Sequence, residues 1–139
     1  MSKISFRGCV GFMVLVTSAS VLVVRAQQPV VEQSPTAEQI EFFEGRVRPV
    51  LAEKCFQCHS SRTSTPFGGL RLDSRQGLLT GGDSGPAVVP GQSEDSAIVQ
   101  RVQGRPVLMP PTGRLNDDEI TALIQWVDMG APWPVATAS

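Results

Sequence analysis

The segment Cys55-Phe56-Gln57-Cys58-His59 holds the residue types with the most definite chemistry in this chain. Two thiols three positions apart, followed at once by an imidazole, have the spacing at which a c-type haem is attached. In that chemistry both sulfurs form thioethers with the porphyrin, and the adjacent histidine binds the iron. The segment therefore predicts one covalently bound haem c, with Cys55 and Cys58 as attachment residues and His59 as an axial ligand.

Two other uses of this cysteine pair match the chain less well. A structural zinc site takes about four Cys or His ligands, but the chain has one His, and its third cysteine, Cys9, lies far upstream. A thioredoxin-like redox pair is expected within a strand–helix pattern of a cytosolic protein, and neither condition is met. A plain pair of surface thiols stays open as the remaining alternative.

Residues 1–26 have the composition of an export signal. Lys3 and Arg7 precede an apolar run, and Val24-Arg25-Ala26 has the small residues of a cleavage site. We therefore expect a signal peptide at 1–26 and a periplasmic or otherwise exported mature protein, where haem can be attached. The apolar run is near the lower limit for spanning a bilayer, so contact with a membrane is expected only if this segment stays uncleaved.

The charge balance of the expected mature chain limits its partners. Without the three basic residues of the signal, nine basic residues face 13 acidic ones, which gives a net charge of −4. No basic stripe is present that could displace counterions from phosphates, so we expect no nucleic-acid partner. About 110 residues bury only a modest core, and a covalently held porphyrin would supply apolar filling.

Helical signals frame the Cys-x-x-Cys-His segment. After a flexible lead-in at 27–35, Thr36 and Gln39 fit a capping box, and apolar residues at helical spacing continue to Leu51. Pro49 cannot donate to the helical ladder, so we expect a kink or restart there. Near the C-terminus, Asn116 and Glu119 form a second capping box before a periodic run that ends at Gly130.

The middle of the chain is less regular. Residues 60–69 predict a loop, and Asp73-Ser74-Arg75-Gln76 predicts the start of a short helix that ends near Gly81. Ser93 is predicted to cap a helix at about 94–102, and a strap follows at 104–113. Gly82-Asp83-Ser84-Gly85 resembles a protease nucleophile loop, but the single histidine belongs to the haem motif, so a turn is the better interpretation.

Met109 is the candidate for the second axial ligand. Only Met109 and Met129 follow the expected signal, and Met129 sits beside Gly130 at the end of a helix. Pro110 keeps the backbone of Met109 out of the helical region, and the 50 residues after His59 are enough to reach the opposite haem face. The alternative is that Met109 packs in the core over an open haem face. Arg71 and Arg75 are candidates to pair with the haem propionates, or are simply solvated.

The order helix, Cys-x-x-Cys-His, irregular middle, methionine strap and final helix resembles the class I cytochromes c. More narrowly, residues 37 to 134 resemble the planctomycete-type cytochrome c domain. The matching segments run in order through the chain: 42–44, 47–51, 55–60, 68–74, 81–86, Met109-Pro110-Pro111 and Gly130-Ala131-Pro132-Trp133-Pro134. Such domains usually open longer proteins, whereas this chain stops soon after, so both a free-standing carrier and the first part of a larger system stay open.

The resemblance implies an all-α, class I-like cytochrome c fold around one covalent haem, with the domain at 36–134 and a tail at 135–139. It implies haem attachment through Cys55 and Cys58, with His59 and Met109 as axial ligands. The expected function is one-electron transfer to an unidentified redox partner protein, without bond-making chemistry and therefore not as an enzyme. Two alternatives stay open: a haem-based sensor or small-gas binder with an open distal site, and a haem docking module for a larger partner enzyme.

Overall fold

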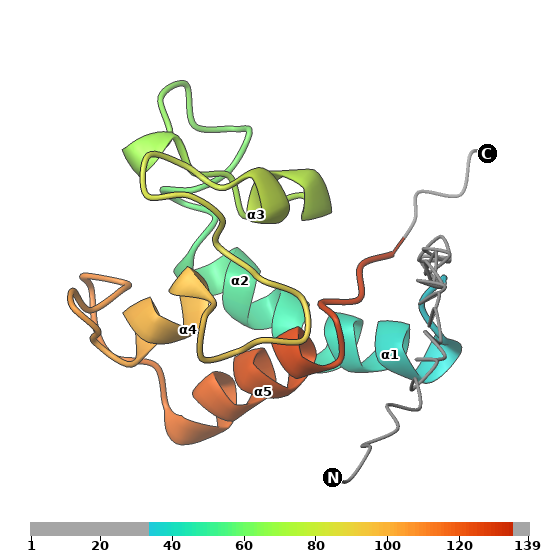
Figure 1. The fold of residues 1–139 in the computed structure, drawn as a ribbon. Helices are drawn as coiled ribbons and strands as arrows, with labels where there is room; N and C mark the ends of the chain where they lie inside the picture. Colours follow the sequence, from blue (N-terminus) through green and yellow to red (C-terminus); the bar gives the residue numbers. More distant parts are fainter. Residues whose placement is uncertain (1–33, 135–139) are drawn as a thin grey trace, which may run out of the picture. The chain divides into compact units, whose positions relative to one another are not determined.

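The computed structural model describes residues 34–134, so the expected signal peptide, most of the lead-in and the tail lie outside the described residues. Figure 1 shows the chain of helices, which are listed here in order: α1 (Ala37–Phe42), η1 (Phe43–Val47), α2 (Arg48–Lys54), η2 (Phe67–Gly69), α3 (Arg75–Thr80), α4 (Ala97–Val102) and α5 (Asp117–Asp128). Within residues 34–134 there is no strand beyond an isolated bridge between Gly82 and Gly85. The prediction of an all-α domain is therefore confirmed for this part of the chain. None of the helices in this range is both long and apolar enough to cross a bilayer.

The first three helices, α1, η1 and α2, follow one another without a gap, and the helix geometry changes just before Pro49. The capping box at Thr36 is present as predicted, with the Thr36 hydroxyl accepting from the Gln39 amide. After α1 the chain forms the wider π-helical segment η1 and returns to α-helix at Arg48. Because Pro49 has no N–H and its ring crowds the preceding turn, the widened segment is where the predicted restart occurs. Helix α2 ends at Lys54 and passes the chain directly to Cys55.

Helix α5 follows the second predicted capping box. The Asn116 side chain accepts from the Glu119 amide, and the Glu119 carboxylate accepts from the Asn116 amide, each at 2.8 Å. Its buried face includes Ile120, Leu123 and Val127 at the predicted spacing.

Aromatic side chains pack α5 against η1. Trp126 is fully buried, and its ring centroid lies 5.9 Å from that of Phe43 in η1. The ring centroid of Trp133 lies 4.6 Å from that of Phe43, and the Arg48 guanidinium lies over both Phe43 and Trp133. These contacts pack the last helix on the first.

Helix α3 begins after the Ser74 cap and ends at Gly81, as predicted. The prediction for α4 was wrong at its start, because the helix begins at Ala97 rather than near Glu94. Ser93 does not cap it: the Ser93 carbonyl accepts from the Ser96 amide in a turn, and the Ser93 amide donates to Asp128. The extra turn serves to bury Ser96, whose hydroxyl bonds the Val89 amide and the Gln92 carbonyl.

Candidate functional site

A cavity of about 380 Å³ lies where the end of α2, η2, α4 and the strap at 105–112 meet. Its volume is within the range typical of small-molecule and cofactor sites, and its walls are mostly apolar. Residues from five separate parts of the chain line it, among them Cys55, Cys58, His59, Leu72, Ile98 and Met109. The four residues that the sequence singled out for chemistry therefore line one cavity.

A tight turn at the end of α2 places the three motif residues on this cavity. The Cys55 carbonyl accepts from the amides of Cys58 and His59, at 3.2 and 3.0 Å. Both cysteines are free thiols and partly buried. Burial, followed by the neighbouring Cys58, raises the pKa of the Cys55 thiol to about 11, so this sulfur stays a neutral thiol near neutral pH.

His59 carries an unpaired polar atom. Its Nδ1 is buried and has no hydrogen-bond partner among the described residues. Leaving a buried ring nitrogen unpaired costs roughly 1–3 kcal/mol, and polar atoms of this kind are usually explained by function. His59 also lies on the cavity wall, where an imidazole can bind a metal ion.

The strap that carries Met109 is tied to α4. The Met109 amide donates to the Arg101 carbonyl at 3.0 Å, and the Arg105 amide donates to the Gln100 carbonyl at 2.8 Å. The Arg101 guanidinium also donates to the Arg105 carbonyl at 3.1 Å. These bonds fix both ends of the segment 105–109 on the helix that forms one cavity wall.

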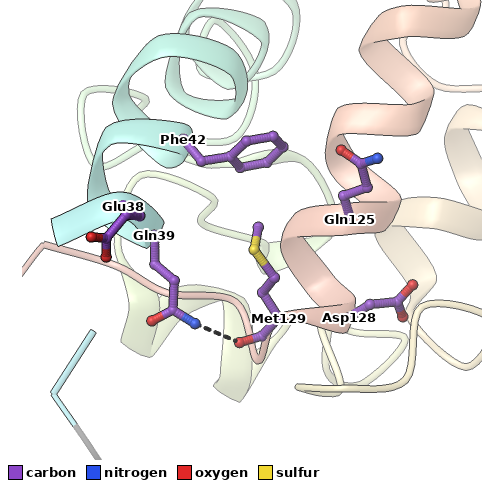
Figure 2. Close-up of a pocket in the computed structure, with 6 residues that line it drawn as sticks. All are labelled: Glu38, Gln39, Phe42, Gln125, Asp128 and Met129. Carbon is purple, nitrogen blue, oxygen red and sulfur yellow. Dashed lines mark hydrogen bonds between the residues drawn. The ribbon is translucent and has the colours of Figure 1, made fainter. Parts of the chain in front are cut away.

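Met129 lies in different surroundings. Figure 2 shows it in a surface groove between α1 and the end of α5, with its thioether directed toward Phe42. Its carbonyl accepts from the Gln39 side chain at 3.5 Å. Met129 is 37% exposed and is not among the residues that line the Cys55–His59 cavity.

Other parts of the cavity wall were not singled out from the sequence. The turn at Gly82–Gly85 lines the cavity, and it is held there by the Asp83 amide, which donates to the Gly68 carbonyl at 2.8 Å. A Cβ at Gly82 would lie 2.1 Å from the same carbonyl oxygen, so the close approach requires glycine. The pattern Gly82-Asp83-Ser84-Gly85 identified the turn but carried no signal of what it packs against.

The cationic residues that line the cavity are not the two arginines that the sequence suggested as partners of the haem propionates. Neither Arg71 nor Arg75 is among the described residues that line it, and the Arg71 guanidinium donates to the Ser60 carbonyl at 3.3 Å. The cationic side chains on the lining are Lys54 and Arg101. Lys54 lies 4.0 Å from Glu119 at the surface, an exposed pair of small energetic value.

Comparison with known proteins relates this site to a family. Residues 55–113 match the family model described as Planctomycete cytochrome C. This segment is similar to the cytochrome c domains of that family. The match begins at the first cysteine of the motif and ends at the last residue of the strap, whereas α1, α2 and α5 lie outside it. No curated protein and no solved structure matches the chain.

A cytochrome c domain implies haem c and points to an electron carrier. The residues at the cavity fit that group: two free thiols at Cys-x-x-Cys spacing, an imidazole directly after them, and apolar walls. The matched segment includes the strap that carries Met109.

Proposed function

We propose that this chain is an exported mono-haem c-type cytochrome with a class I-like fold that transfers single electrons to a partner protein. The observation that carries the proposal is the single cavity lined by Cys55, Cys58, His59 and Met109 within a cytochrome c family segment. Haem c supplies one-electron redox chemistry when it is bound.

Each of the four residues has a distinct role in this proposal. Cys55 and Cys58 would hold the cofactor covalently, so that it would stay with the protein outside the cell. His59 and Met109 would bind the haem iron, and a thioether ligand favours the reduced state and raises the reduction potential. The bond from the Met109 amide to Arg101 supports this role because it limits the positions that the weak thioether ligand can take.

The remaining cavity residues act by excluding water. Leu70, Leu72 and Ile98 supply apolar contacts, and Leu72 and Ile98 are buried at 4% and 6% exposure. A dry surrounding opposes the extra positive charge of the oxidised state and so adds to the effect of the methionine. No nucleophile or general base is required for this function, and for that reason we propose an electron carrier rather than an enzyme.

Carbon monoxide distinguishes the carrier from a sensor with an open distal site. Because Met109 would occupy the distal position, the reduced wild-type protein should bind carbon monoxide slowly at neutral pH. Met109→Ala should bind it rapidly and should lose the methionine-to-iron absorption band of the oxidised protein. Met129→Ala is the matched control, since Met129 lies in the groove of Figure 2, and it should behave as the wild type. Equally rapid binding by the wild type and Met109→Ala would support the sensor instead.

The export part of the proposal depends on residues 1–26. Their basic start, apolar run and small-residue cleavage site support cleavage before Gln27, in a compartment where haem is attached. The N-terminal residue of the purified protein tests this directly. A protein that begins at Gln27 and fractionates with periplasmic or secreted proteins fits the proposal, whereas one that keeps residues 1–26 and pellets with membranes would be an anchored form.

A further inference from the structure

The orientation of the His59 ring is not fixed in the usual way. A metal-binding histidine almost always donates its second ring nitrogen to a carboxylate or carbonyl, which sets the plane of the imidazole. In residues 34–134, the buried Nδ1 of His59 has no such partner. The hydrogen bonds that hold His59 are instead made by its backbone, at its amide and at its carbonyl.

On the N-terminal side, the turn at Cys55 supplies this support. The His59 amide donates to the Cys55 carbonyl at 3.0 Å, which continues the geometry of α2 by one residue. This bond fixes the start of His59 but leaves the chain after it free to rotate. The C-terminal side must be fixed by other contacts.

Those contacts come from Leu72 and Asp73. The Leu72 amide donates to the His59 carbonyl at 2.8 Å. The Asp73 carboxylate accepts from both the amide and the hydroxyl of Ser61, each at 2.6 Å and each to the same oxygen. Hydrogen bonds to a charged acceptor are shorter and stronger than neutral ones, so the Ser61–Asp73 contact is the firmest of this set.

The Asp73 side is itself held by a helix. Ser74 follows directly and caps α3, with its hydroxyl accepting from the Gly77 amide at 3.1 Å. Gly77 packs so closely that a Cβ there would lie 2.5 Å from the Arg71 carbonyl oxygen. The carboxylate is therefore attached to a fixed element, and the segment after His59 is held against it.

We propose that Asp73 is a positioning residue that sets the plane of the His59 imidazole through Ser61, in place of the missing hydrogen bond at Nδ1. The inference rests on the proposed function, because it concerns His59 as a ligand of the haem. Removing either Ser61 donor or the Asp73 charge loosens the backbone after His59 and lets the ring turn.

The test uses the complete exported holoprotein and reads the ring plane directly. In the oxidised protein the spread and order of the haem methyl proton resonances depend on the orientation of the axial imidazole. Asp73→Asn and Ser61→Ala should change this pattern, and amide hydrogen exchange at Leu72 should accelerate by about tenfold. Ser61→Thr keeps both donors and should retain the wild-type pattern.

Asp118→Asn is the control for loss of charge. Asp118 is exposed in the first turn of α5, is not among the residues that line the cavity and makes no hydrogen bond to residues 59–61, so its variant should leave the methyl pattern and Leu72 exchange unchanged. Unchanged patterns in Asp73→Asn and Ser61→Ala would overturn the inference, and so would an Asp118→Asn pattern that shifts as Asp73→Asn does. If Asp73→Asn does not fold, Ser61→Ala alone decides. A wild-type protein without covalent haem would instead refute the proposed function.

Discussion

At the scale of single residues, the Asp73 carboxylate combines a structural and an electrostatic role. Burial raises its pKa, but hydrogen bonds from the Ser61 hydroxyl and amide, together with the Arg71 charge, outweigh that effect and hold the pKa below its ordinary value. The folded state therefore binds the ionised form more strongly than the unfolded chain does. Stability must then depend on the protonation of this one group.

The sign of that dependence gives a prediction. A carboxyl with a lowered folded pKa contributes stability that is fully present above its unfolded pKa, about 3.9, and lost as the pH falls through the folded pKa. The difference in free energy of unfolding between the wild type and Asp73→Asn should be largest near about pH 7 and shrink toward about pH 3. Urea unfolding at the two pH values measures it. The same difference at both would show that ionisation of Asp73 contributes nothing.

The single-residue predictions succeeded where the chemistry is contiguous in the chain. Cys55, Cys58 and His59 are adjacent, so their spacing alone predicts that they face one site, and they line one cavity. The contact between Ser61 and Asp73 spans 12 residues and depends on how the loop between them closes. No local pattern encodes that closure, so this contact could be found only in the structure.

At the scale of elements, the helix starts differ in what their polar residues bond. Thr36 and Asn116 form reciprocal capping boxes that are visible in the sequence as a Thr or Asn three residues before a Gln or Glu. Ser93 is also a residue type that often caps helices, but its amide donates to Asp128 and its carbonyl accepts from Ser96. The start of α4 is set instead by the buried Ser96, whose partners lie four to seven residues upstream.

The corrected start of α4 predicts a difference between two serines. Ser96→Ala leaves the Val89 amide without its partner in a buried position, so the free energy of unfolding should fall by about 1–3 kcal/mol. Ser93→Ala removes no side-chain bond that the structure contains and should cost less than about 0.5 kcal/mol. Thermal unfolding of the two variants decides between them. A larger loss in Ser93→Ala would restore Ser93 as the helix cap.

The cap of α5 gives a second prediction at this scale. Asn116→Ala removes the acceptor of the Glu119 amide, and the free energy of unfolding should fall by about 1 kcal/mol. Asn116→Asp keeps an acceptor at the same place and should retain most of the stability. Denaturant unfolding with unchanged m-values would measure both changes. Equal losses in the two variants would mean that the cap bond does not contribute.

At the scale of the whole molecule, the helical frame and the cavity have different origins. The frame follows from periodic apolar residues and capping signals, and for this reason α3 and α5 could be predicted with their ends and α1 with its start. The cavity is built where irregular segments meet, including η2, the turn at 82–85 and the strap. Their apolar residues lack a period, so the sequence located the strap but not its neighbours.

Some apolar residues at the cavity are exposed because they belong to these irregular segments. Phe67 and Val107 are 68% and 54% exposed although both line the cavity. They come from η2 and the strap, two segments that have no helical face to bury. A covalently held porphyrin would give these side chains an apolar neighbour, which agrees with the small core available to about 110 residues.

The mass of the purified, denatured protein, measured together with its absorption spectrum, tests the central claim most directly. A thioether-linked cofactor survives denaturation, so we expect a polypeptide heavier than its bare chain by one haem, with the spectrum of a c-type cytochrome. A Cys55→Ala, Cys58→Ala double variant should lose both properties. A colourless wild-type protein with the mass of the bare chain, produced by a host that attaches haem to other cytochromes, would contradict the account.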